Sequence, residues 1–143
     1  MYNFLNELLN CEDAPINHPV VMLTNNRSQR TRHKRVSTKV VNRIKMNLRQ
    51  YFGCSNCGSM ENLSFHHIDP TKKSGCVSSI RGYQKVWNEI SKCCVLCTTC
   101  HDSYHNDGKQ VNASRIVLHP FQQRMFKEEA IFQLINEGVL EYD

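Results

Sequence analysis

The sequence predicts an α+β fold in which a small core with two strands lies between helical N- and C-terminal extensions. Three observations lead to this expectation. Apolar residues recur every fourth position from Val36 to Leu48, which is the period of an amphipathic helix. The segments NLSFHHI at 62–68 and CCVL at 93–96 have the length and apolar character of strands. One Cys-x-x-Cys pair stands before the first segment and another follows the second, so a single metal ion could join them.

Length and composition exclude several classes of protein. A chain of 143 residues is long enough for one domain, or for one small core with helical extensions. It contains no run of about eighteen apolar residues, so no membrane partner is expected. The stretch MYNFLNELLNCEDAP lacks a basic start and carries acids early, which is not typical of a signal peptide. We therefore expect a cytoplasmic location, where thiols stay reduced.

The formal net charge of +5 is distributed unevenly. Residues 1–26 carry acids but no Lys or Arg, and only acids follow Lys127. The stretch between Arg27 and Arg49 is rich in Lys and Arg and contains no acid. Such asymmetry is typical of a polyanion partner, and we expect double-stranded DNA. Phosphate contacts are predicted for Arg27, Arg30, Arg32, Lys34, Arg35, Lys39, Arg43, Lys45 and Arg49, with a smaller patch at Lys72 and Lys73.

Start and stop signals place the helices. One helix is expected from Ser37, a residue suited to the N-cap, to Tyr51, after a loop at 20–35. A last helix is expected from Pro120 to about Glu137, followed by Gly138. Its predicted buried residues are Phe121, Met125, Phe132 and Ile135. Shorter helices are expected at 2–10, 83–92 and 98–107. The chain thus divides into an acidic extension at 1–26, a basic loop and helix at 27–53, the core at 54–108 and a helical extension at 109–143.

Four of the eight cysteines form the two pairs, Cys54 with Cys57 and Cys97 with Cys100. Two thiolates at this spacing reach one ion from a single tight turn, and two such turns complete a tetrahedron. In a reducing compartment such pairs bind metal, so a structural Zn²⁺ is expected. Cys94 and Cys97 share the same spacing, but a helix that starts directly after Cys97 favours the pair with Cys100. Four buried reduced thiols are the alternative without a metal.

Histidines form a second candidate metal site. His101 and His105 lie four residues apart on a predicted helix, so their side chains stand one above the other. His66 and His67 are neighbours on a predicted strand, so their side chains point to opposite faces. We expect His66 to complete a three-histidine site and His67 to point toward solvent or substrate. A neutral imidazole there is a ready general base near neutral pH. Surface histidines, or His101 as a substitute zinc ligand, are the alternatives.

Residues 54–105 resemble the HNH endonucleases, whose fold is the ββα-metal motif. The resemblance rests on FHHID, the paired Cys-x-x-Cys and LCTTCHDSYH, which occur in the family's order. It implies that the core is a ββα-metal fold stabilised by the four-cysteine zinc. It also implies that His66, His101 and His105 bind a catalytic divalent ion and that His67 activates water.

The reaction implied by the resemblance is hydrolysis of DNA phosphodiester bonds with one metal ion, leaving 5′-phosphate and 3′-hydroxyl ends. Three neutral imidazoles leave the charge of a dication undiminished and suit a transition metal better than Mg²⁺. Mn²⁺, Ni²⁺ or Co²⁺ should therefore support activity at least as well as Mg²⁺, and Zn²⁺ is also a candidate. Small free-standing members of the family are often nicking or homing enzymes. A phage-encoded member would act in the cytoplasm of its bacterial host.

Other functions fit parts of the same pattern. A zinc-dependent DNA-binding module without catalysis would use the three histidines for a second structural zinc. RNA is a weaker candidate as substrate because the basic stretch carries no array of stacking aromatics. One position departs from the family, which often places a loop-bracing Asn where this chain has Lys92; Asn88 or Ser91 could substitute. Target sequence and oligomeric state, monomer or homodimer, stay open.

Overall fold

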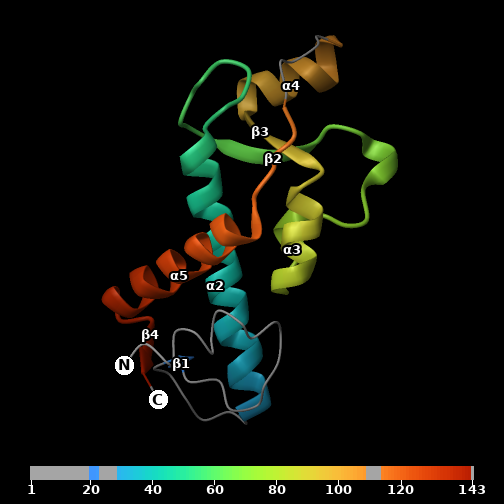
Figure 1. Ribbon diagram of the computed structural model, residues 1–143. Helices are drawn as coiled ribbons and strands as arrows, with labels where there is room; N and C mark the ends of the chain where they lie inside the picture. The colour runs from blue at the N-terminus through green and yellow to red at the C-terminus, as the bar shows by residue number, and fades with distance from the viewer. Residues whose placement is uncertain (1–19, 23–28, 109–113, 143) are drawn as a thin grey trace.

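The computed structural model describes residues 20–22, 29–108 and 114–142, whose arrangement is shown in Figure 1. The predicted helix at 2–10 and Arg27 lie outside these residues. Within them helices combine with two small antiparallel sheets, which confirms the α+β class. The sheets pair β1 (Val20–Met22) with β4 (Leu140–Tyr142) and β2 (Leu63–His67) with β3 (Cys93–Cys97). In the described part of the chain, no helix has the length and apolar character needed to cross a membrane.

Helix α2 (Gln29–Phe52) is the longest element of the described chain and runs through the fold (Figure 1). It begins well before Ser37, which is a buried residue inside the helix. The predicted N-cap at Ser37 is therefore wrong, as is the predicted loop from Gln29 onward. The cause is the good helix propensity of Arg, Lys and Gln, which lets the helix extend beyond its apolar row. That row is fully buried, as its period predicts: Val36, Val40, Ile44 and Leu48.

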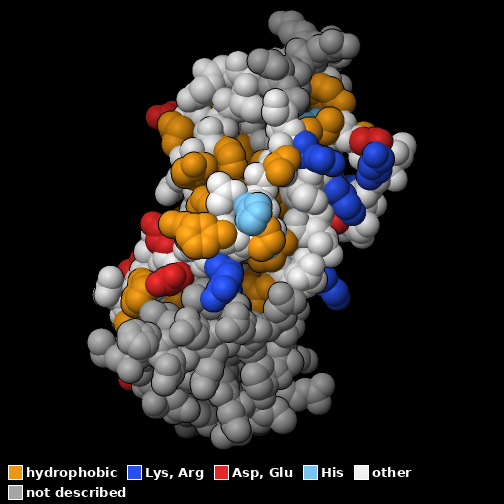
Figure 2. Space-filling view, in the orientation of Figure 1, with side chains coloured by type: hydrophobic (Ala, Val, Ile, Leu, Met, Phe, Trp, Pro, Cys, Tyr) orange, Lys and Arg blue, Asp and Glu red, His pale blue; other side chains and the backbone are white. Residues whose placement is uncertain are grey.

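Helix α5 (Pro120–Asn136) packs along α2, and its bounds match the predicted start at Pro120 and stop before Gly138. Its predicted buried face is wrong. Phe121 is 67% exposed, Met125 54% and Phe132 38%, and Ile135 is only half-buried. The helix carries apolar residues on more than one face, and its buried residues are Lys127, Ala130, Ile131 and Leu134. Apolar side chains accordingly gather on the surface where α5 lies (Figure 2).

Helix α3 (Tyr83–Ile90) and two short 3₁₀ turns connect β2 with β3. The helix lies within the predicted range 83–92, buries Val86 and Ile90, and half-buries Trp87. The loop before it contains two 3₁₀ turns, η1 (Pro70–Lys72) and η2 (Val77–Ser79). Pairing of β1 with β4 was not predicted, because three-residue strands carry too little pattern to be distinguished from a loop.

The candidate site segments meet where β3 passes into helix α4 (Thr98–Asp107). The β2–β3 register places His66 opposite Cys94 and His67 opposite Cys93. Gly108 ends α4 in the left-handed region at φ 66°, in agreement with the predicted end of this helix at 107. The main hydrophobic core lies between α2, α3 and α5. A separate small cluster beside the sheet consists of Cys54, Cys94, Leu96, Cys97 and Cys100.

Candidate metal centres and the histidine–glutamate network

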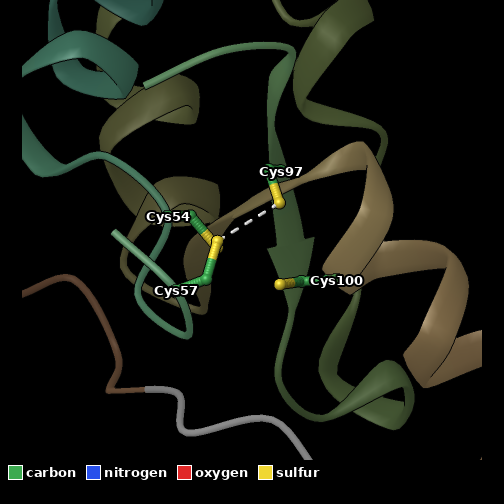
Figure 3. A group of neighbouring side chains, drawn as sticks. All are labelled: Cys54, Cys57, Cys97 and Cys100. Carbon is green, nitrogen blue, oxygen red and sulfur yellow. Dashed lines mark hydrogen bonds between the residues drawn. The ribbon is translucent and has the colours of Figure 1, made fainter. Parts of the chain in front are cut away.

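The four cysteines of the two predicted pairs converge on one point, which we call the cysteine cluster (Figure 3). Cys54 and Cys57 come from the turn after α2, Cys97 ends β3, and Cys100 lies in the first turn of α4. Their sulfur atoms all lie within 4.8 Å of one another, and Cys57 Sγ is 3.6 Å from Cys97 Sγ. Four thiolates around one Zn²⁺ stand about 3.8 Å apart, given a Zn–S distance of about 2.3 Å. The geometry therefore suits a tetrahedral ion.

Backbone hydrogen bonds build the first cysteine turn and fix it to the sheet. The N–H of Gly58 donates to Cys54 O at 2.9 Å, and Gly58 takes a φ of 77° that favours glycine. The N–H of Ser55 donates to Val95 O at 2.9 Å, which ties the turn to β3. Burial raises the pKa of Cys54, but backbone hydrogen bonds at Cys57, Cys97 and Asn56 lower it to about 6. This thiol is thus prepared to bind as a thiolate.

The structure resolves the two possible registers of the second pair. Cys94 lies on β3 opposite His66, and it is not among the sulfur atoms that converge. Cys97 and Cys100 are therefore the pair that joins Cys54 and Cys57, as the helix start predicts.

The second group of converging ligands, the histidine cluster, consists of His66, His101 and His105. Their ring nitrogens lie within 4.8 Å of one another, and the Nε2 atoms of His101 and His105 are 3.1 Å apart. Two imidazole nitrogens on one ion at about 2.0–2.1 Å stand roughly 3.0 to 3.4 Å apart. The helix repeat and the strand register thus produce the convergence that the histidine spacing predicts. Within the described residues, no carboxylate joins this group.

The histidine cluster favours uncharged imidazoles. Burial, followed by the proximity of His101 and His105, lowers the pKa of His66, whose exposed fraction is 6%. Burial and the neighbouring His105 lower the pKa of His101 as well. Neutral imidazole is the form that binds a metal ion. Tyr104, which the sequence did not single out, packs edge-on against the His66 ring with 4.6 Å between centroids and limits the freedom of that ring.

His67 does not point freely into solvent as expected. Its Nε2 atom lies 2.6 Å from Oε1 of Glu89, and its side chain is 11% exposed. Glu89 is buried at the end of α3 and accepts hydrogen bonds from the N–H groups of Ser74 and Gly75. Burial alone would raise the pKa of Glu89, but hydrogen bonds from Ser74, His67, Lys92 and Gly75 lower it to about 2. The carboxylate is therefore ionised near neutral pH.

Lys92 occupies the position where the resemblance led us to expect a loop-bracing Asn, and it contacts the loop before α3. Its Nζ atom donates to Ser74 Oγ at 2.9 Å and to Glu89 Oε2 at 3.1 Å. Neither of the two expected substitutes does so: Asn88 bonds Gln84, and the Ser91 hydroxyl donates to the Asn88 carbonyl. No local pattern marks Glu89 or Lys92 as site residues, because their partners lie in a loop distant in sequence.

The predicted phosphate contacts differ in their surroundings. Lys39, Lys72 and Lys73 are exposed and Arg35 is half-exposed, while Arg30, Arg32 and Lys34 lie on the first turns of α2. Lys and Arg side chains are visible over the loop between β2 and α3 (Figure 2). Three residues of the predicted set are held by the protein itself, as follows.

Arg43 forms a two-pronged ion pair with Glu137, in which Nη2 lies 2.6 Å from Oε1. Arg49 is half-buried, with its guanidinium 5.7 Å from the Phe65 ring. Lys45 is only 4% exposed, and its Nζ donates to Ile80 O at 2.7 Å. Burial lowers the pKa of Lys45. The expectation that Lys45 reaches DNA is therefore wrong, because a flexible four-carbon stem lets its ammonium fold inward onto backbone carbonyls.

Comparison of the chain with models of protein families, with curated proteins and with solved structures returns no match.

Proposed function

We propose that this protein is a metal-dependent DNA endonuclease of the HNH type. The observation that carries the proposal is that two neighbouring histidines of β2 have different partners. His66 belongs to the histidine cluster, whereas His67 lies against Glu89. Successive side chains of a strand point to opposite faces. Two adjacent histidines can therefore serve as a metal ligand on one face and as a base on the other. The order β2, β3, α4 is also that of the ββα-metal motif.

The cysteine cluster supports a structural Zn²⁺ in this proposal. Four sulfur ligands with no open position are the donor set of a structural zinc site. Such an ion would fix the start of α4 to the turn after α2. His101 directly follows Cys100, so the position of the histidine cluster depends on the cysteine cluster.

The reaction follows from the chemistry of the side chains. His66, His101 and His105 would hold a divalent ion, which would supply positive charge to offset the negative charge that develops on the phosphodiester group. His67 removes a proton from water, and the resulting hydroxide attacks phosphorus in line. The products carry a 5′-phosphate and a 3′-hydroxyl. The nitrogen-only ligand set favours Mn²⁺, Ni²⁺ or Co²⁺ over Mg²⁺.

DNA would be positioned by the cations that the protein does not hold for itself. Arg35 and Lys39 on α2, and Lys72 and Lys73 in the loop after β2, are available for phosphates. These contacts neutralise phosphate charge and set the orientation of the duplex without reading its sequence. Lys45 and Arg43 are left out of this set because both are engaged within the protein.

Supercoiled plasmid incubated with the protein, with EDTA or with a panel of divalent ions, tests the proposal. We expect metal-dependent nicked or linear product, and at least a 100-fold loss of cleavage in His67→Ala. This variant should keep its zinc, its fold and its DNA affinity. His119→Asn is the matched control, because His119 is exposed, lies outside both clusters and caps α5, a role that Asn can also fill.

The competing function is a zinc-dependent DNA-binding module without catalysis. In that case the plasmid would be bound and retarded in a gel, and no metal in the panel would convert it to product. A strict requirement for Mg²⁺ would instead argue against ligation by three histidines. Cleavage that persists in His67→Ala would refute the role of His67 while leaving a nuclease in place.

A further inference from the structure

Glu89 is buried beside His67, and the proposed reaction gives it no role. On the basis of that proposed function, we infer that Glu89 is a positioning residue that holds His67 as the Nε2–H tautomer. The other ring nitrogen, Nδ1, is then the atom that accepts the proton from water. Glu89 itself touches neither water nor DNA in this scheme and acts through His67.

The hydrogen-bond partners of Glu89 determine which atom carries the proton that lies between Glu89 and His67. Oε1 receives Ser74 N at 3.0 Å and Gly75 N at 3.3 Å, and Oε2 receives the ammonium of Lys92. All of these groups are donors, and an ionised carboxylate can only accept. The proton between Glu89 and His67 therefore sits on Nε2 of His67, at 2.6 Å from the carboxylate oxygen. An imidazole protonated at Nε2 carries its free lone pair on Nδ1.

The same contacts prevent Glu89 from adopting another position. Its side chain is 4% exposed, and its donors come from a loop, from β2 and from the residue before β3. Rotation of the carboxylate would leave the N–H groups of Ser74 and Gly75 without this acceptor and would remove one of the two acceptors of the Lys92 ammonium. Loss of these hydrogen bonds is unfavourable, so the observed orientation of the carboxylate is strongly favoured. A carboxylate on the far nitrogen of a base also stabilises the imidazolium that forms when the base takes a proton.

A purely structural role for Glu89 makes different predictions. If it only anchored the loop at 74–75 to α3, its removal would lower stability and DNA binding without changing the tautomer of His67. If it positions His67, its removal should lower kcat by about 10-fold or more, since residues that orient metal-binding imidazoles contribute about 10- to 100-fold and the Asp that orients a catalytic base contributes more. KM for DNA should then change by less than about twofold, because the phosphate contacts are elsewhere.

The first measurement uses the unmodified chain and does not depend on activity. Long-range ¹H–¹⁵N spectra of protein carrying ¹⁵N-histidine show which ring nitrogen holds the proton. We expect the Nε2–H tautomer for His67 in the full-length protein. Detection of the Nδ1–H tautomer would overturn the inference, whatever the protein does to DNA.

Two variants complete the test. The first is the double variant Glu89→Gln, Lys92→Met. Its amide oxygen can still accept hydrogen bonds from His67, Ser74 and Gly75. The amide N–H₂ group would face the ammonium of Lys92, another donor, so Lys92 is replaced by Met. We expect this double variant to keep the Nε2–H tautomer and to retain more activity than Glu89→Ala. Glu89→Ala should show mixed tautomers and the full loss of kcat. In a His67→Ala background, Glu89→Ala should reduce kcat no further, because both residues act through the same imidazole.

The outcomes separate the inference from the function on which it rests. A wild-type protein that cleaves no plasmid would overturn both. Cleavage by the wild type with an unchanged kcat in folded Glu89→Ala would overturn the inference alone. A further drop in kcat when Glu89→Ala is added to His67→Ala would likewise assign Glu89 a structural role.

Discussion

The cysteine cluster provides the sharpest test of how this fold is held together. In the small hydrophobic cluster around it, the only fully buried large aliphatic side chain among the described residues is Leu96, and the other buried members are cysteines. Burial of one leucine contributes about 1.5–3 kcal/mol. A structural zinc contributes about 10–16 kcal/mol at neutral pH. We therefore expect the proposed Zn²⁺, and not hydrophobic packing, to hold the cysteine turns.

Cys57→Ser is the perturbation we would choose, because Cys57 is exposed and its replacement leaves no cavity. Shared evenly over four ligands, the zinc free energy is about 2.5 to 4 kcal/mol per thiolate. Loss of one thiolate should thus weaken zinc binding roughly 60- to 700-fold. Cys76→Ser is the matched control, since Cys76 is an exposed cysteine outside the cluster. Its zinc affinity should equal that of the wild type.

Amide hydrogen exchange locates the effect within the chain. The N–H groups of Ser55, Gly58 and Thr98 donate across the cysteine turns to Val95 O, Cys54 O and Asn62 O, respectively. These amides should lose protection when a chelator removes the zinc, and Cys57→Ser should lose it at lower chelator concentration. Amides in the core of α2 should keep theirs, because the main core is a separate cluster. Unchanged protection of Ser55 and Gly58 after zinc removal would refute the reasoning. Equal loss in α2 would show that the two clusters unfold as one unit.

Three further predictions address the core, the DNA contacts and the network around Glu89. Ile44→Ala should lower the free energy of unfolding by about 2–5 kcal/mol in urea titrations, whereas the exposed Phe132→Ala should change it by less than about 1 kcal/mol. Lys39→Ala should reduce the salt dependence of DNA binding by about 0.9 in the log–log slope, whereas Lys45→Met should leave that slope unchanged, because Nζ of Lys45 is bound to carbonyls inside the protein. Glu89 has a folded-state pKa of about 2 against an ordinary value of 4.5, so its ionised form stabilises the fold above pH 4.5. This contribution is lost as the pH falls from 4.5 to about 2, and acid unfolding of Glu89→Gln should lack that part of the transition.

The network around Lys92 ties the loop that contains Ser74 to the end of α3. The side-chain amide of an Asn can both donate and accept hydrogen bonds, whereas the ammonium of a lysine can only donate. Lys92 therefore needs acceptors as its partners. Ser74 Oγ supplies one acceptor and Glu89 Oε2 another. The charge of Lys92 in turn helps to keep Glu89 ionised next to His67. Lys92 and Glu89 therefore form one unit, and changing either alone should disturb both the loop and the imidazole.

Features that depend on local periodicity were predictable. The buried row of α2 follows from a four-residue repeat, and the end of α4 follows from Asp107-Gly108. The histidines of α4 share one face because the helix repeat brings residues four apart together. The two Cys-x-x-Cys turns indicate their own geometry, because each reaches a common ion from within a few residues.

Features that depend on which segments meet were decided only by the tertiary structure. The apolar residues of α5 occupy more than one face, and only contact with α2 determines that Ile131 is buried while Phe121 is exposed. The pairing of His67 with Glu89 joins β2 to α3, and neither residue carries a local signal of the other. Lys45 resembles its basic neighbours in sequence, but the carbonyls of η2 and the residue after it draw its ammonium inside. Sequence specifies the chemistry and local geometry of each segment. The protonation, burial and partners of a side chain depend on distant segments that fold against it. For His67, the candidate base, that segment is the end of α3 with Glu89.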